Sequence, residues 1–546
     1  MRKTLLPAAV LLAATSAFAQ SLTEKIDVAL VNVDVTVTSH GAPTRGLTRD
    51  NFEVLEDGVA RPITHFYAIE NAREKTTPAA APASSVAAAG TSQPDETDER
   101  FRRRVLVIID NRHMSFHYRD VALRKLEQFI NDHFSSGSYD WSIAMIGERA
   151  HLLLPLTSDK TRIHDTLAEI HSVVAGRTIR DMYHLENRIA PIIPEAVVGA
   201  SMGPSSGGEG ALNALIEQSN RFQYAADAAT TYQSIREVAR SFANAPGRKI
   251  ILLLTGVFSE EENALSALDP TLATRQQAAI EEIRNQLIRE ANASNVSVNV
   301  INVEGLMPNN VGADSHGSTG SDSMRPGSSG GASAGGMFWI ARQTGGQSFT
   351  GNFVDRSLRD FDVTSSNFYS LAYRPDHGED RKYHSITVRL KKPGRYSLTY
   401  RNGYSSLPVE LQLERAMTST MSVEMQPSTI PVGLTTGTGA AADVAGAVVV
   451  PIYTAVPAKQ LQFIPTGDKS VARVDFFVSI FGESGRLIRT FRTVREAQAK
   501  PGSEGEGNFV ETRSVRLRKG VPYRLVVAVH DQVTDAIGIT SKTVRF

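Results

Sequence analysis

Near the start of the chain, apolar and polar residues alternate strictly over residues 26–37, so that four valines share one face. A period of two is typical of a half-buried β-strand. The next apolar stretch, residues 52–67, is divided by Asp57-Gly58, a dipeptide that favours a tight hairpin because both positions tolerate a positive φ. Together these patterns predict a small β module over residues 20–70.

A different pattern begins at Arg104, where continuous apolar runs alternate with helix-length amphipathic segments. Continuous runs suit strands that are buried on both faces of a parallel sheet. Alternation of such strands with helices predicts a doubly wound α/β domain, Rossmann-like in topology, with helices on both faces of the sheet. We expect this domain to span residues 102–404, with the later runs FYSLAYRP, YHSITVRL and RYSLTYR completing the edge of its sheet.

The final part, residues 446–546, carries six strand-length apolar stretches separated by turn residues, with no helical pattern between them. This spacing predicts an antiparallel all-β sandwich of immunoglobulin-like architecture. Segments rich in small and polar residues lack the apolar side chains that would offset the entropy of ordering them. We therefore expect a disordered linker at 71–101, a second linker at 405–445, and flexible insertions near 193–211 and 308–336.

The first residues carry a targeting pattern. Arg2 and Lys3 precede an apolar run over residues 5–14 that is too short to span a bilayer, and Ala17-Phe18-Ala19 matches the small-x-small motif of signal peptidase sites. We expect residues 1–19 to be a signal peptide cleaved after Ala19, and the mature chain to be periplasmic or secreted. No later segment approaches about 18 consecutive apolar residues, so no transmembrane segment is expected in the mature chain.

Composition excludes several classes of function. Lys plus Arg and Asp plus Glu both count 58, so no net field attracts nucleic acid, and we expect no nucleic-acid partner. The chain has no cysteine, which rules out disulfides, a thiolate zinc site and a cysteine nucleophile. The His-Glu-x-x-His, Gly-x-Ser-x-Gly and phosphate-loop signatures of common enzyme classes are also absent.

Asp110 ends the run VLVIID, and Thr255 ends the run KIILLLT later in the chain. A segment GLTRDNFEVLEDG precedes them, and TGGQSF, YSLAYRP and RNGY follow in that order. This combination resembles von Willebrand factor A domains, specifically a divergent, exported group known mostly from acidobacteria. The resemblance covers roughly residues 24–404 and implies a recognition site at the carboxyl-terminal edge of the sheet.

Metal-binding members of that family hold a divalent cation with an Asp-x-Ser-x-Ser turn, a distant Thr and a distant Asp, and such hard oxygen ligands suit Mg²⁺. In this chain Asp110 occupies the first position, but Arg112 stands at a serine position and Ser115 is one residue out of register. Gly256 follows Thr255 where an aspartate is usual. The resemblance therefore implies a degenerate metal-dependent adhesion site with candidate metal ligands Asp110, Ser115 and Thr255, and no cofactor unless Mg²⁺ binds there.

Arg112 and Asp110 each admit two interpretations. The guanidinium of Arg112 could pair with the Asp110 carboxylate and replace the charge of the ion, leaving a basic contact for an acidic partner, or it could point outward from a loop. Asp110 could serve as a ligand or could cap the helix that follows it. The candidate partner-binding residues are Asp110, Arg112, Ser115 and Thr255.

These observations predict a non-enzymatic, exported binding or adhesion protein whose partner is another protein or a cell-surface ligand. The alternative is a structural scaffold protein of the cell envelope in which the β modules make the contacts. A third hypothesis, from a different class, is a hydrolase that uses His113 with Asp110, which requires the two side chains to converge in a pocket.

Overall fold

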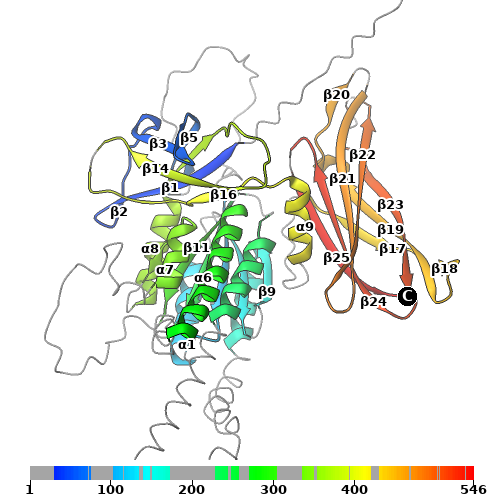
Figure 1. The fold of residues 1–546 in the computed structure, drawn as a ribbon, viewed down its shortest axis with the longest axis horizontal. Coiled ribbons are helices and arrows are strands. Elements are labelled where there is room, and N and C mark those ends of the chain that lie inside the picture. Colours follow the sequence, from blue (N-terminus) through cyan, green and yellow to red (C-terminus); the bar gives the residue numbers. More distant parts are fainter. Residues whose placement is uncertain are drawn as a thin grey trace, which may run out of the picture.

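The chain is predominantly β-structured, with far more residues in strands than in helices across the part that the computed structural model describes (Figure 1). The described residues are 30–74, 102–133, 139–171, 228–256, 270–303 and 335–546, except for short gaps at 72, 115, 148–149, 244–246, 350–352, 393, 420–429, 467–468, 501, 503–504 and 535. The predicted signal peptide, most of the linker 71–101 and nearly all of the two predicted insertions lie outside them.

The N-terminal strands pair with strands that come far later in the chain. β1 (Val31–Ser39) runs antiparallel to β13 (Phe368–Tyr373), and β3 (Phe52–Glu56) runs antiparallel to β14 (Tyr383–Leu390). The valines of β1 share one hydrophobic core with residues of β3, β13 and β14. The other strands of these two sheets are β2 (Ala42–Pro43), β4 (Val59–Arg61), β5 (Ile63–Glu70), β6 (Arg73–Glu74), β15 (Ser397–Thr399) and β16 (Gly403–Ser405).

The predicted hairpin at Asp57-Gly58 is confirmed. These two residues have φ of 49° and 82°, and they join β3 to its antiparallel neighbour β4. The turn also reaches β14, because the amide of Asp57 donates a hydrogen bond to the carbonyl of Ser385 at 3.0 Å. A short 3-10 helix, η1 (Arg49–Asn51), leads into β3.

A six-stranded sheet forms the central part of the described chain, in the order β12-β11-β10-β7-β8-β9. Neighbouring strands are parallel, except that β8 and β9 are antiparallel. Leu254 lies opposite Ile109, so β10 and β7 end side by side. The strands are β7 (Arg103–Asp110), β8 (Tyr139–Ile146), β9 (Ala150–Thr157), β10 (Arg248–Thr255), β11 (Val296–Asn302) and β12 (Ser348–Phe349).

Helices pack on both faces of the six-stranded sheet through separate clusters of buried apolar side chains. α1 (Phe116–His133), residues 160–171 and α8 (Val354–Ser366) contribute to one cluster. Residues 228–241, α6 (Pro270–Ala293) and α7 (Gly335–Gln343) contribute to the other. None of the helices in the described residues is long and apolar enough to cross a membrane.

The C-terminal part contains two antiparallel sheets that share a core, to which β19, β21, β23 and β24 contribute buried side chains. α9 (Val409–Ser419) packs on β24 and buries Leu413 and Met417, although it falls within the predicted linker 405–445. The elements are β17 (Gly433–Thr436), β18 (Ala440–Ala441), β19 (Ala447–Pro457), η3 (Ala458–Gln460), β20 (Ile464–Thr466), β21 (Lys469–Phe481), β22 (Leu487–Ala499), β23 (Asn508–Arg518), β24 (Pro522–Asp531) and β25 (Ile537–Arg545).

The fold class expected from the sequence is wrong. It was a doubly wound α/β domain of Rossmann-like, von Willebrand A type, with a separate small N-terminal β module and a C-terminal immunoglobulin-like sandwich. The described residues are instead mostly β: four antiparallel sheets accompany the six-stranded, mostly parallel sheet, and no clear doubly wound core is shown among them. FYSLAYRP and YHSITVRL form β13 and β14, which pair with β1, β3 and β5 and not with the edge of the parallel sheet. The physical reason is that these half-buried strands bury their apolar faces against each other.

Candidate functional site

Asp110 and Thr255 meet at the ends of two adjacent parallel strands. Asp110 is the last residue of β7 and Thr255 the last residue of β10. The Thr255 hydroxyl donates a hydrogen bond to Oδ2 of Asp110 at 2.7 Å. Both residues are buried, with exposed fractions of 0% and 2%. The two predicted site residues are therefore brought together, but beneath the molecular surface.

His113 provides a further partner for the buried carboxylate. Its Nδ1 lies 2.8 Å from Oδ2 of Asp110. On the other carboxylate oxygen, the backbone amides of Arg112 and His113 donate at 3.1 and 3.3 Å. Hydrogen bonds from amides two and three residues ahead are the pattern of an aspartate that stabilises its own turn. Because α1 begins only at Phe116, Asp110 orders the turn after β7 and does not cap that helix.

The environment of Asp110 keeps its carboxylate ionised. Burial alone would raise the pKa of Asp110, because a charge is poorly solvated in the interior. The positive charge of His113 and the hydrogen bonds from His113, Thr255 and the Arg112 amide outweigh that effect and hold the pKa below 3.8. The protein thus supplies its own hydrogen-bond donors to this buried carboxylate.

Arg112 does not use its guanidinium to pair with Asp110. Its Nη1 donates instead to the carbonyl of Gly147, just after β8, at 3.0 Å. The side chain therefore fastens the turn after β7 to the turn after β8, and the residue remains partly exposed. This contact differs from both interpretations of Arg112 made from the sequence.

The described residues do not fit Mg²⁺ at this edge. Both oxygens of Asp110 already accept hydrogen bonds, and the buried carboxylate faces His113. The remaining candidate ligand, Ser115, lies outside the described residues.

The Asp110–His113 pair has the orientation that a general base requires, because a carboxylate on Nδ1 fixes the tautomer and the ring position. However, the His113 side chain is only 3% exposed. A substrate cannot reach this imidazole in the structure. His117, the next histidine, is exposed on α1 and does not complete the pair into a larger described cluster. The hydrolase hypothesis requires an imidazole that a substrate can contact, whereas the side chain of His113 is buried among the described residues.

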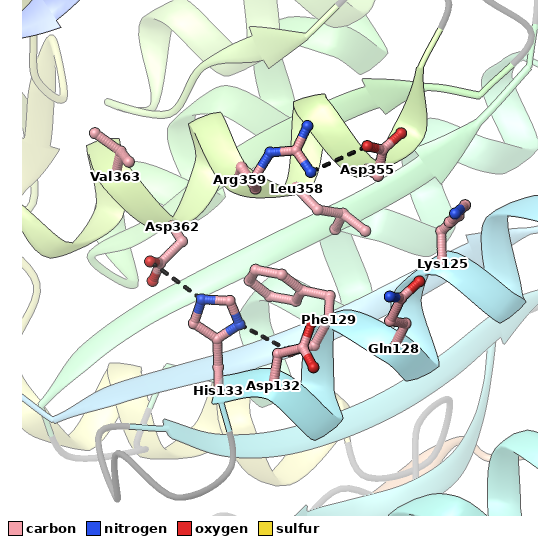
Figure 2. Close-up of a pocket in the computed structure, with 10 residues that line it drawn as sticks. All are labelled: Lys125, Gln128, Phe129, Asp132, His133, Asp355, Leu358, Arg359, Asp362 and Val363. Atoms are coloured by element: carbon pink, nitrogen blue, oxygen red, sulfur yellow. Dashed lines mark hydrogen bonds and ion pairs between the residues drawn. The ribbon is translucent and has the colours of Figure 1, made fainter.

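A polar groove lies between α1 and α8, with a volume of about 380 Å³ (Figure 2). Its charged side chains largely neutralise one another: Arg359 pairs with Asp355 at 3.0 Å, and His133 lies 3.4 Å from Asp362. Asp362 is also held by Arg103 at 3.0 Å. The groove therefore presents no concentrated charge, and its contacts are those of two packed helices.

One group of side chains was missed in the sequence. His377 and Asp380, on the connection between β13 and β14, lie close to His384, the second residue of β14. Their spacing, His-x-x-Asp-x-x-x-His, is visible in the sequence. It matches none of the enzyme signatures considered in the sequence, such as His-Glu-x-x-His.

Comparisons with known proteins give little further guidance. No protein-family model matches the chain, and no curated protein matches it. Among solved structures, the chain is similar to an aerotolerance-related membrane protein from Bacteroides fragilis NCTC 9343 with multiple mutations to serines. The identity is 12% and the TM-score 0.23, over 48% of this chain and 98% of that chain.

The chain is also similar to a calcium-binding mutant of Bacteroides uniformis beta-glucuronidase 2, at 14% identity and a TM-score of 0.15, over 21% of this chain. A Bacteroides uniformis beta-glucuronidase matches 34% of this chain at 13% identity and a TM-score of 0.15. This chain spans 13% and 20% of the length of those two proteins. Likenesses this weak carry no argument about function.

Proposed function

We propose that the chain is a non-enzymatic, exported binding protein of the divergent von Willebrand factor A-related group. Its partner is a protein or cell-surface ligand that presents an acidic group to the turns around Asp110 and Arg112. Family membership and export are inferred from the sequence motifs. The observation that carries the mechanism is the 2.8 Å contact between the His113 imidazole and the Asp110 carboxylate.

The contact between His113 and Asp110 implies that an acidic partner is bound without a bridging cation. In metal-dependent adhesion, a cation bridges the protein and a carboxylate of the partner. Here the carboxylate of Asp110 is satisfied from within the chain, so no bridging ion is needed to stabilise it. Positive charge at the rim comes from Arg112, whose guanidinium is already oriented by the Gly147 carbonyl. A pre-ordered arginine loses less conformational entropy when it binds a carboxylate.

The test compares two arginines on the immobilised full chain. An envelope extract of the exporting cell is passed over the wild type and over R112E and R124E variants, first without Mg²⁺ and then with it. Arg124 is a matched control because its side chain is 60% exposed on α1 and pairs only locally with Asp120. We expect R112E to lower the affinity of the retained ligand at least about tenfold, or ~1.4 kcal/mol, and R124E to leave it unchanged.

Added Mg²⁺ should not strengthen retention by the wild type. If Mg²⁺ is required, the metal-dependent mechanism applies and our account of His113 is wrong. If R112E binds as well as R124E does, recognition lies elsewhere on the chain, as the scaffold alternative requires. Failure of the wild type to retain any ligand would contradict the binding function itself.

A further inference from the structure

Two histidines and an aspartate converge where the connection after β13 leads into β14. The potential ligand atoms of His377, Asp380 and His384 all lie within 4.8 Å of one another. Nε2 of His384 is 3.0 Å from Oδ1 of Asp380. The ring of His377 lies beside that of His384, with ring centroids 3.8 Å apart and planes inclined by 15°. The side chains are 22%, 28% and 8% exposed for His377, Asp380 and His384, so the group is open to solvent from one side.

A second carboxylate orients the more buried histidine. Oδ2 of Asp57 lies 2.8 Å from Nδ1 of His384, which directs the opposite nitrogen, Nε2, toward Asp380. Asp57 is itself held in place, because its Oδ1 accepts hydrogen bonds from the amide and the hydroxyl of Ser385 at 2.8 and 3.0 Å. Histidines that bind metals commonly donate their second ring nitrogen to a carboxylate in this way, which sets the tautomer.

The turn at Asp57-Gly58 explains why this carboxylate is available. The positive φ of Asp57, 49°, is part of the tight hairpin between β3 and β4. β3 pairs with β14, so the end of the hairpin lies beside the first residues of β14. The contact joins residues 327 positions apart in the sequence. Asp57, in the turn after β3, thus orients His384 on the neighbouring strand β14.

We propose that His377, Asp380 and His384 bind one divalent transition-metal ion of the zinc class, with Asp57 as the positioning residue behind His384. Two imidazoles and one carboxylate are a donor set that suits Zn²⁺, whereas Mg²⁺ and Ca²⁺ prefer oxygen ligands alone. Three protein ligands leave one position of a tetrahedral ion for a water molecule or an outside donor.

The observed spacing is compatible with this ion after a small movement. Zinc bonds to nitrogen and oxygen of about 2.0–2.2 Å place neighbouring tetrahedral ligand atoms about 3.3 Å apart. The atoms of His384 and Asp380 are separated by 3.0 Å, so they need to open by a few tenths of an ångström. His377 must turn its ring so that a nitrogen faces the ion. It is the more exposed of the two histidines. Its Nδ1 lies 2.8 Å from the carbonyl of Gly378 and its Nε2 3.1 Å from the Tyr404 hydroxyl, so one of these contacts must be exchanged for the ion.

The test uses Zn²⁺ alone with the full chain, carrying no added histidine tag, in competition with a chromophoric chelator. We expect each chain to bind one Zn²⁺ ion tightly, and we expect this binding to be lost when His377 and His384 are both replaced by alanine. Asp380→Asn should also weaken Zn²⁺ binding. Because it is a single change at a partly exposed turn position, it still tests the site if the double variant folds poorly. Asp57→Asn is compatible with the positive φ of this turn position. It should weaken Zn²⁺ binding about 10–100-fold, because it removes the carboxylate that orients His384. The control, His151→Gln, alters an exposed histidine of β9 and should retain the full equivalent.

Co²⁺ provides a second readout, because a four-coordinate site gives Co²⁺ a far stronger visible absorption than water ligands do. We expect this absorption with the wild type and the His151→Gln protein and not with the Asp380→Asn protein. An equivalent of Zn²⁺ that survives both the double-histidine and the Asp380→Asn changes would overturn the proposal. So would the absence of a tight equivalent in the wild type, which would leave His384 as an ordinary partner of its two carboxylates. These outcomes do not involve the Asp110 edge, so they are independent of the proposed binding function.

Discussion

Replacing Thr255 by valine isolates one hydrogen bond to the buried carboxylate of Asp110. The hydroxyl of Thr255 donates to Oδ2 of Asp110 at 2.7 Å, and both residues are almost completely buried. Valine keeps the branched shape but cannot donate. The carboxylate would then keep only His113 and the two backbone amides as partners.

The expected loss of stability follows from the charge of the acceptor. A hydrogen bond to an ionised group contributes about 1.5–3 kcal/mol, so Thr255→Val should lower the free energy of unfolding by that amount near neutral pH. Thr255→Ser is the matched control, because it keeps the hydroxyl and removes one methyl group. Its expected cost is about 1 kcal/mol, from lost apolar burial.

Tryptophan fluorescence makes the measurement specific to this part of the chain. The sequence has two tryptophans, Trp141 on β8 and Trp339 on α7, and both belong to the six-stranded sheet and its helices. Trp141 is 1% exposed, so its emission should shift to the red when this region unfolds in urea. A chain with several cores is not expected to unfold in one step, and the fluorescence signal follows one of them.

The pH dependence separates the two variants further. The folded pKa of Asp110 is lowered below 3.8, so the stability it contributes is present above that pH and is lost as pH falls through the folded pKa. Removing the Thr255 hydroxyl raises the folded pKa and reduces this contribution. The gap between the two variants should therefore shrink as the pH falls below the usual titration range of an aspartate. Equal losses for both variants at neutral pH, or a gap that does not change with pH, would refute the reasoning.

Two other changes test the packing elsewhere. Asp475→Asn removes a buried carboxylate that lies 3.1 Å from Nδ1 of His530, and should destabilise the C-terminal sheets by about 3 kcal/mol. Circular dichroism should show an earlier transition while the tryptophan signal stays unchanged, and a shifted tryptophan signal would contradict the separation of the cores. Gly346→Ala would place a Cβ against the backbone carbonyl of Val298, and should cost about 3 kcal/mol or more in the tryptophan-detected transition. Gly147→Ala meets nothing within 4 Å and serves as its control, so a similar loss in both glycine variants would disprove the steric explanation.

Part of the candidate site followed from sequence, and part did not. The ends of two buried apolar runs suggested that Asp110 and Thr255 belong to one site, and in the structure they share a hydrogen bond. Contact between His113 and Asp110 is expected only under the hydrolase hypothesis, and no pattern in the sequence indicates that the Arg112 guanidinium binds the Gly147 carbonyl. Both depend on how a short turn folds over a buried carboxylate, and side-chain direction in a turn leaves no periodic trace in the sequence.

The cluster around His384 also combines a feature that is visible in the local sequence with one that depends on the tertiary fold. The spacing of His377, Asp380 and His384 is local and readable in the sequence. The carboxylate of Asp57 that supports His384 comes from 327 residues earlier. No pattern near either residue indicates the other, because their proximity follows from the pairing of β3 with β14.

Local patterns in the sequence were enough to predict the alternating strand β1, the tight turn at Asp57-Gly58 and the buried runs of β7 and β10. These follow from hydrophobic period and backbone preference, which act over a few neighbouring residues. Only the tertiary structure decided that β1 pairs with β13 and not within a separate module. Alternation shows that one face of a strand is buried, but many apolar faces can cover it, and the choice among them depends on the packing of the whole chain.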